Sequence, residues 1–325
     1  MKFGIVGTAG IGVKSVIPAV QASEHAAAAI ASRDEARASA VADELGIPTA
    51  YGSYEALLAD DSLDAVYIPL PNSLHADWVR AAADRGLHVL CEKPLTASAD
   101  ETAAVFDYCE DADVTLMEGF MYRFHPRTER AAELVASELG EVVSVTSNFS
   151  FRLPDGAENI RIDPDLAGGS VMDVGCYAVS AARLFLGTPD RVYATTTDTC
   201  DCGVDTRMSG VLEYDDGATA RVESSFDTPE TQYYRVQTTD GWLEAKTAFN
   251  VDPTASAELT YATDGRVVTE TFDPTDSYRR EVEAFARAVE TGETPRIDRE
   301  ESVAVMRTID AIYESAETGA AVDLN

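Results

Sequence analysis

The chain opens with Lys2-Phe-Gly-Ile-Val-Gly-Thr-Ala-Gly-Ile-Gly12, an apolar run followed at once by a glycine-rich turn. We expect a strand over Lys2 to Val6, a helix from the turn to about Ser23, and a second strand over Ala26 to Ala31. Glycine in such a turn lets the backbone approach a pyrophosphate, and the helix N-terminus that follows favours its negative charge. The strand-turn-helix-strand order therefore predicts a dinucleotide-binding unit.

The turn itself supplies the first predicted cofactor contacts. It departs mildly from the G-x-G-x-x-G pattern, because alanine stands where the second glycine belongs and adds one methyl group. We expect the cofactor to contact Gly7, Ala9, Gly10, Ile11 and Gly12.

The end of the second strand bears on which nicotinamide dinucleotide is bound. An NAD site expects an acidic residue that bonds the ribose 2′-hydroxyl, but this strand ends Ser32-Arg33-Asp34. Ser32 can donate to a 2′-phosphate, while Arg33 can pair with that phosphate and stack on adenine. Asp34 comes too late for the ribose role. The pattern favours NADP over NAD, although the three residues could also simply cap the next helix.

Strands and helices alternate from residue 1 to about 120, which predicts a doubly wound parallel sheet. Further strands are expected over Ala65 to Pro69, Leu87 to Cys91 and Val114 to Met117. After the first of these, Asn72 is a natural N-cap for a helix that runs through Asp84. We interpret Asn72 and His75 as contributors to the cofactor pocket, although a histidine in a first helical turn is more often structural.

The segment Val89-Leu-Cys-Glu-Lys-Pro-Leu95 places Lys93, one of only four lysines among 25 basic residues, just after a predicted strand. Ligands bind at the carboxyl ends of strands in an open α/β sheet. A compact ammonium group there can donate to a substrate oxygen and lower the pKa of a neighbouring hydroxyl. We interpret Lys93 as catalytic and Glu92, Lys93 and Pro94 as cofactor contacts. The alternative is a surface lysine beside a turn-forming proline.

The pattern changes after residue 121. One helix, Arg127 to Glu138, precedes runs rich in valine, threonine, tyrosine and phenylalanine at 142–152, 191–199, 206–214, 218–226 and 232–238. Asp215-Asp-Gly217 and Asp240-Gly241 are hairpin-type turn signals. We therefore expect an α/β protein with a Rossmann domain over 1–121. An α+β domain over 122–325 should hold a large, mostly antiparallel sheet with helices on one face, and the last helix should pack back on the first domain.

The composition limits the class of protein. Hydrophobic residues make up 45% of the 325, so the chain is globular despite a formal charge of -32. Scattered acidic residues and scarce lysine suggest adaptation to molar salt, and they argue against nucleic acid or anionic membranes as partners. Five cysteines without framework spacing, and no expected signal peptide, favour a reduced cytoplasm. Cys200 and Cys202 lack enough companions for a zinc site, so no metal is expected.

A third motif, Gly168-Gly-Ser-Val-Met-Asp-Val-Gly-Cys-Tyr177, comes before the strand-rich region. With Cys91-Glu-Lys-Pro94 and the N-terminal turn, it resembles the glucose-fructose oxidoreductase / inositol dehydrogenase (Gfo/Idh/MocA) family over nearly the whole chain. Many members place histidine where Tyr177 stands. Tyrosine there, and Glu118-Gly-Phe-Met-Tyr-Arg-Phe-His-Pro126, look like the branch that holds dimeric dihydrodiol dehydrogenase and NADP-linked D-xylose dehydrogenase.

The resemblance implies a reaction. Tyr177 would take a proton from a sugar hydroxyl as hydride leaves the same carbon, because the Lys93 ammonium favours the phenolate of a group whose pKa is ordinarily about 10. Asp173, four residues earlier on the same helical face, would orient the substrate. Arg123 and Phe124 would also contact it. For Tyr177 the alternative is an aromatic packed in the core, and for Asp173 a helix N-cap.

These roles imply an NADP-dependent dehydrogenase that oxidises C1 of an aldopyranose, with D-xylose favoured, to the lactone. The resemblance also implies a homo-oligomer, a dimer or tetramer through the second-domain sheet. Alternatives are a trans-dihydrodiol dehydrogenase, another sugar oxidoreductase of the family, or a non-catalytic sensor that binds NADP and sugar. A redox-cycling glycosidase on this fold is a further alternative, but it leans toward histidine at the position of Tyr177.

Overall fold

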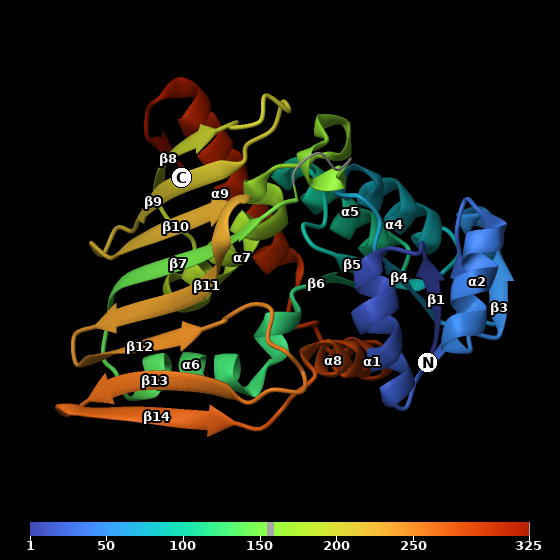
Figure 1. The fold of residues 1–325 in the computed structure, drawn as a ribbon, viewed down its shortest axis with the longest axis horizontal. Helices are drawn as coiled ribbons and strands as arrows, with labels where there is room; N and C mark the ends of the chain where they lie inside the picture. Colours follow the sequence, from blue (N-terminus) through green and yellow to red (C-terminus); the bar gives the residue numbers. More distant parts are fainter. Residues whose placement is uncertain (155–158, 325) are drawn as a thin grey trace. The chain divides into compact units, whose positions relative to one another are not determined.

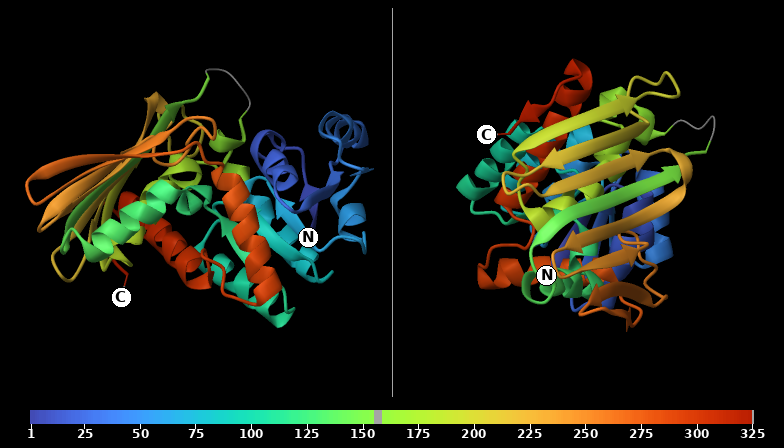
Figure 2. Two further views of the ribbon diagram at one scale, coloured as in Figure 1. Left: turned by 90° about the horizontal axis from the view of Figure 1, so that it is seen from below. Right: turned by 90° about the vertical axis from the view of Figure 1, so that its left-hand side faces the viewer.

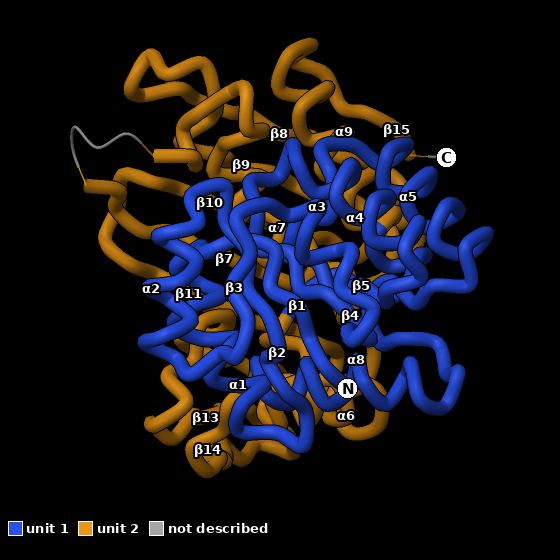
Figure 3. The backbone as a smooth tube through the Cα atoms, turned by 90° about the vertical axis from the view of Figure 1, so that its right-hand side faces the viewer, with its two compact units in different colours: residues 1–120, 278–302 blue, residues 121–277, 303–325 orange. Residues whose placement is uncertain are grey.

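The computed structural model describes residues 1–154 and 159–324. The chain divides into two compact units (Figure 3): unit 1 comprises Met1–Phe120 and Tyr278–Ser302, and unit 2 comprises Met121–Ser277 and Val303–Asn325. Within the described ranges, every helix is too short or too polar to span a membrane.

Unit 1 is built on a six-stranded parallel sheet with the order β3-β2-β1-β4-β5-β6, as the alternating pattern predicts. Its central strand β4 is buried along its whole length, which is typical of a parallel sheet covered on both faces. The α8 helix belongs to this unit (Figure 1). Its Phe285 ring lies 6.0 Å from that of Phe3 on β1. The strands are β1 (Lys2–Val6), β2 (Ala26–Ala31), β3 (Thr49–Tyr51), β4 (Ala65–Ile68), β5 (His88–Glu92) and β6 (Leu116–Gly119).

The helices of unit 1 follow strands, as in a doubly wound fold. A π-helical turn η1 (Gly12–Val16) leads into α1 (Ile17–Ala22), which matches the predicted first helix. The others are α2 (Glu35–Leu45), α3 (Tyr54–Leu58), the 3-10 turn η2 (Asn72–Leu74), α4 (His75–Ala83), α5 (Ala99–Asp111) and α8 (Ser277–Thr291).

Unit 2 holds a nine-stranded sheet with the order β14-β13-β12-β11-β7-β10-β9-β8-β15. Among its described pairs, β7 and β10 are parallel and the others antiparallel, which confirms the expected sheet. The strands are β7 (Val142–Arg152), β8 (Arg191–Thr197), β9 (Arg207–Glu213), β10 (Thr219–Ser225), β11 (Asp227–Thr238), β12 (Gly241–Lys246), β13 (Ala257–Thr263), β14 (Arg266–Phe272) and β15 (Val322–Asp323).

Helices cover one face of this sheet. They include α6 (Pro126–Ser137), α7 (Cys176–Leu186), which continues a π-helical turn η6 (Val171–Gly175), and most of α9 (Arg299–Thr318). Short 3-10 turns complete the unit: η3 (Met121–Phe124), η4 (Ile160–Ile162) and η5 (Pro164–Leu166). The right-hand view of Figure 2 shows the opposite face of the sheet without a covering helix. Its strands alternate buried and exposed residues, and Val143, Tyr193 and Val267 are exposed.

Candidate active site

The glycine turn of unit 1 joins β1 to the first helical run, as the sequence predicts. Gly7 has φ +119°, a backbone conformation that favours glycine, and it donates to the Ala31 carbonyl at 3.0 Å. A Cβ atom on Gly10 would meet nothing within 4 Å, so the space in front of the turn is open. Val13 begins the helical bonding by donating to Ala9, so the amides of Gly10, Ile11 and Gly12 have no carbonyl partner within the helix and can donate to an anion. The turn fits a dinucleotide pyrophosphate.

The carboxyl end of β2 lies beside β1 in the parallel pairing and carries Ser32 and Arg33. Ser32 is buried, and its hydroxyl accepts from the Asp34 amide. Asp34 is the N-cap of α2, because its carboxylate accepts from the Ala36 and Arg37 amides. The capping alternative therefore holds for Asp34, which leaves Ser32 and Arg33 as the candidates for a 2′-phosphate. Sequence reasoning missed Arg37, whose guanidinium donates to the Thr8 carbonyl at 3.2 Å and so lies against the glycine turn.

Asn72 and His75 lie after β4, at the same edge of the sheet as the glycine turn. The prediction that Asn72 caps the long helix is wrong: it is the first residue of η2, and the N-cap of α4 is Leu74, which has no capping side chain. The helix starts late because a 3-10 turn comes between strand and helix. His75 is wholly buried, with its Nε2 2.7 Å from the Leu70 carbonyl and its Nδ1 2.9 Å from the Pro94 carbonyl. Burial lowers the pKa of this imidazole. Its two contacts connect the loop after β4 to the loop after β5.

The Lys93 loop follows β5 and begins with a cis Lys93–Pro94 peptide bond. Glu92 accepts from the Tyr67 hydroxyl at 2.7 Å. The Leu95 amide donates to Glu118 Oε1 at 2.8 Å. Burial raises the pKa of the Glu118 carboxyl to about 7. Through its bond to Leu95, this buried group anchors the loop to the interior of unit 1. Lys93 therefore has a fixed backbone on both sides.

Tyr177 lies in unit 2 on the first turn of α7 and is 5% exposed. The rings of Phe149 and Phe249 lie 5.4 Å from its ring, and that of Tyr122 lies 5.9 Å away. The Tyr177 hydroxyl donates to the Met121 sulfur at 3.3 Å, an acceptor weaker than oxygen. Aromatic side chains thus surround the ring of Tyr177.

Asp173 lies in η6, one helical turn before Tyr177, and is half-buried. Arg161 pairs with it, Nε to Oδ2, at 2.7 Å. Sequence reasoning missed this partner, because nothing in the sequence links the two residues. The ion pair fixes the orientation of the Asp173 carboxylate, which can accept a hydrogen bond from a hydroxyl group.

Arg123 and Phe124, the other predicted substrate contacts, lie in η3 of unit 2. Phe124 is buried, and Arg123 Nη1 lies 3.5 Å from the Ser180 hydroxyl, which also bonds the Tyr122 hydroxyl at 2.8 Å. This network connects the Arg123 segment to helix α7.

The predicted residues therefore form two groups. Those expected to hold the cofactor lie at the carboxyl ends of adjacent parallel strands β2, β1, β4 and β5 in unit 1. Of those expected to bind or act on substrate, Lys93 lies in unit 1, and Asp173, Tyr177, Arg123 and Phe124 lie in unit 2. Asp173 and Tyr177 belong to one continuous helical run.

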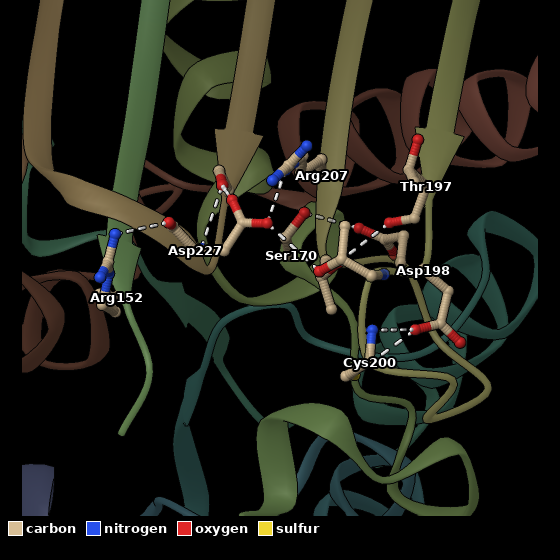
Figure 4. A network of polar contacts seen from close by, with 11 residues as sticks. Arg152, Ser170, Thr197, Asp198, Cys200, Arg207 and Asp227 are labelled. Atoms are coloured by element: carbon tan, nitrogen blue, oxygen red, sulfur yellow. Dashed lines mark hydrogen bonds and ion pairs between the residues drawn. The ribbon is translucent and has the colours of Figure 1, made fainter. Parts of the chain in front are cut away.

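Cys200 and Cys202 are joined in a disulfide, whereas reduced cysteines are expected from the composition. Their loop also holds Asp198, whose carboxylate accepts from the Cys200 amide (Figure 4). It also accepts from the Gly203 amide. The two sulfurs and an Asp198 oxygen lie within 4.8 Å of one another. Because the Asp198 carboxylate accepts from two amides of the loop, it stabilises the loop conformation.

Comparison with known proteins identifies the family. Residues 1–120 match the family described as "Oxidoreductase family, NAD-binding Rossmann fold", and residues 128–244 match the "GFO/IDH/MocA C-terminal domain". The chain belongs to the GFO/IDH/MocA oxidoreductase family. The resemblance inferred from the three motifs is thereby confirmed.

Relatives within the family are similar over nearly the full chain. A Haloferax volcanii protein named D-xylose 1-dehydrogenase (NADP(+)) 2 is 94% identical over 100% of both chains. A crystal structure of KijD10, a 3-ketoreductase from Actinomadura kijaniata with NADP and TDP-benzene, has a TM-score of 0.91 at 31% identity and covers 97% of each chain. That of an aldose-aldose oxidoreductase from Caulobacter crescentus with glycerol has a TM-score of 0.92 at 28% identity and covers 100% and 99%.

Proposed function

We propose that this protein is an NADP-dependent D-xylose 1-dehydrogenase, which oxidises C1 of the pyranose to the lactone. The observation that carries the proposal is the 94% identity, end to end, with the Haloferax volcanii protein of that name. A Xenopus tropicalis trans-1,2-dihydrobenzene-1,2-diol dehydrogenase is 33% identical over 62% of the chain, which favours the sugar over the diol. The salt-loving source suggested by the composition agrees with the Haloferax relative.

The cofactor site is proposed for unit 1. Bound NADP would supply the acceptor for the substrate hydride. The glycine turn would hold its pyrophosphate through free amides, and Ser32 and Arg33 would recognise its 2′-phosphate. Arg37 adds a second guanidinium beside the turn. Glu92, Lys93 and Pro94 would border the nicotinamide end, and His75 and Asn72 would support that wall.

Tyr177 is proposed as the base that takes the proton from the C1 hydroxyl, with Lys93 favouring its phenolate. Solved structures of KijD10 include variants in which a lysine and a tyrosine were replaced. Those two residues are separated by the same number of positions as Lys93 and Tyr177. Asp173, oriented by Arg161, would accept from a second sugar hydroxyl, and Arg123 and Phe124 would border the sugar.

A homo-oligomer through the second-domain sheet is proposed from the family resemblance, and the face of the nine-stranded sheet that carries no covering helix is the surface that such a contact would use. Under the predicted division into 1–121 and 122–325, the cofactor would bind the first domain, and this surface would belong to the second. We further propose a cytoplasmic location, on the basis of the composition.

The test is reduction of NADP by the purified protein in molar KCl, followed as absorbance of NADPH. Turnover with D-xylose above that with dihydrodiols or polyols supports the proposal. Binding of NADP without turnover of any sugar would favour the sensor.

A further inference from the structure

The Gly168-Gly169-Ser170 turn, which leads into the helical run with Asp173 and Tyr177, is built around one carboxylate. Asp205 comes from the loop between β8 and β9 and is buried. Its Oδ2 accepts from the Ser170 hydroxyl at 2.6 Å and from the Val171 amide at 2.9 Å. Its backbone carbonyl also accepts from the Ser170 amide at 2.8 Å. One residue thus fixes two consecutive residues at the start of η6.

The second oxygen of Asp205 is held from another part of unit 2. The Tyr313 hydroxyl, on α9, donates to Oδ1 at 2.8 Å. Burial, and then the neighbouring carboxylate, raise the pKa of Tyr313 well above its ordinary value, which keeps it a donor. The carboxylate therefore receives three side-chain or amide donors and cannot rotate without breaking one of them.

The close approach of this carboxylate explains one glycine of the motif. Gly169 has φ +121°, and a Cβ atom built on it would clash with Asp205 Oδ1. The Gly169 carbonyl accepts from the Asp173 amide at 3.0 Å, the bond that starts the helical run. The motif turn, the carboxylate and the backbone of Asp173 are thus linked by direct contacts.

We infer that Asp205 is a positioning residue for catalysis: its carboxylate fixes the turn that sets where Asp173 and Tyr177 lie. The inference rests on the proposed function, in which these two residues orient and deprotonate the sugar. A displacement of about 1 Å in a reacting group can cost a hundredfold in rate, so an anchor at the start of the helix controls turnover without touching substrate.

Asp227 provides a matched control, because it is a second carboxylate of unit 2 that is held by three side-chain donors. Asp227 accepts from the Arg207 guanidinium at 2.6 Å, the Thr199 hydroxyl at 3.2 Å and the Ser225 hydroxyl at 2.6 Å. Figure 4 shows Asp227 and Arg207 near Ser170. No bond described for the Asp227 side chain reaches residues 168–177. Loss of Asp227 therefore removes a comparable set of bonds but leaves the motif turn in place.

The experiment compares Asp205→Ala, Asp205→Asn and Asp227→Ala with the wild-type protein in molar KCl. The measurements are kcat and KM for D-xylose, calorimetric NADP affinity and melting temperature. We expect Asp205→Ala to lower kcat about a hundredfold with NADP affinity unchanged. Asp205→Asn, which still accepts from Ser170 and Val171, should recover most of that loss. Asp227→Ala should have a lower melting temperature than the wild-type protein but keep kcat within about twofold.

If wild-type protein turns over D-xylose and Asp205→Ala does so equally well, the positioning role is wrong. If Asp227→Ala loses as much kcat as Asp205→Ala, the effect is general destabilisation, and the inference also fails. If Asp205→Ala does not fold, Ser170→Ala takes its place, with an expected loss of about tenfold from one missing hydrogen bond. Failure of the wild-type protein to oxidise any sugar overturns the proposed function instead.

Discussion

Replacing Tyr177 with phenylalanine removes one oxygen from a side chain whose packing is made by its ring. The contacts with Phe149 and Phe249 at 5.4 Å are ring contacts and remain in the variant. The lost hydrogen bond goes to the Met121 sulfur, a weak acceptor. We therefore expect the free energy of unfolding to fall by less than about 1 kcal/mol.

The effect on rate should be far larger. A positioned general base contributes about 10²- to 10⁴-fold to a proton transfer. Because a tenfold change in rate corresponds to about 1.4 kcal/mol, the activation free energy should rise by about 3 to 5 kcal/mol. The loss should appear in kcat, with NADP affinity unchanged, because the predicted cofactor residues lie in the other unit.

The assay is NADPH formation with saturating D-xylose, together with thermal unfolding and NADP titration. Tyr122→Phe is the control, because that buried tyrosine packs on Tyr177 and loses a hydrogen bond to Ser180. It should be the less stable variant and yet keep kcat within about threefold. Near-normal turnover in Tyr177→Phe, or an equal loss in both variants, would refute the assignment of the base.

Three further predictions concern cofactor choice, pH and salt. Arg33→Ala should raise KM for NADP by about tenfold or more, as expected for loss of one phosphate ion pair, and leave KM for NAD nearly unchanged; equal effects on both cofactors would contradict a 2′-phosphate role. The raised pKa of Glu118, about 7, means that the folded state holds this proton more tightly than the unfolded state, so its contribution to stability is present below about pH 4.5 and is lost as pH rises to 7. Between pH 4.5 and 7, the free energy of unfolding of Glu118→Gln, measured from melting curves, should rise relative to that of the wild-type protein by as much as about 3 kcal/mol. A difference in unfolding free energy that does not change with pH would contradict burial of the acid. Because the formal charge is -32, the melting temperature should climb steeply between low and molar KCl, and a flat response would remove the salt-adaptation interpretation.

The cofactor unit could be predicted in detail because its signals are local. A strand, a glycine turn and a helix are consecutive in sequence, and the predicted strands Lys2 to Val6 and Ala26 to Ala31 match the structure residue for residue. The start of α4 was missed because the 3-10 turn at Asn72 depends on a buried histidine that holds the loop. The contact between His75 and the Leu70 carbonyl cannot be predicted from local helix propensity.

The second unit was predicted less completely. Strands β12 to β15 were not identified, since they are short or carry polar residues on an exposed face. Asp173 and Tyr177 could be named because a motif carries them. Their supports, Arg161 and Asp205, could not, because each is brought to the motif only by the tertiary fold. The sequence does show a glycine at position 169, and the structure gives the reason: its φ is positive, and Asp205 leaves no space for a Cβ atom.

The most direct test of the central claim is the initial rate of NADPH formation by purified wild-type protein with D-xylose in molar KCl, measured with NADP and then with NAD. The account predicts turnover of D-xylose with a clear preference for NADP, and a lactone or its hydrolysed acid as product. NADP binding without turnover of D-xylose, glucose or any related aldose would contradict it.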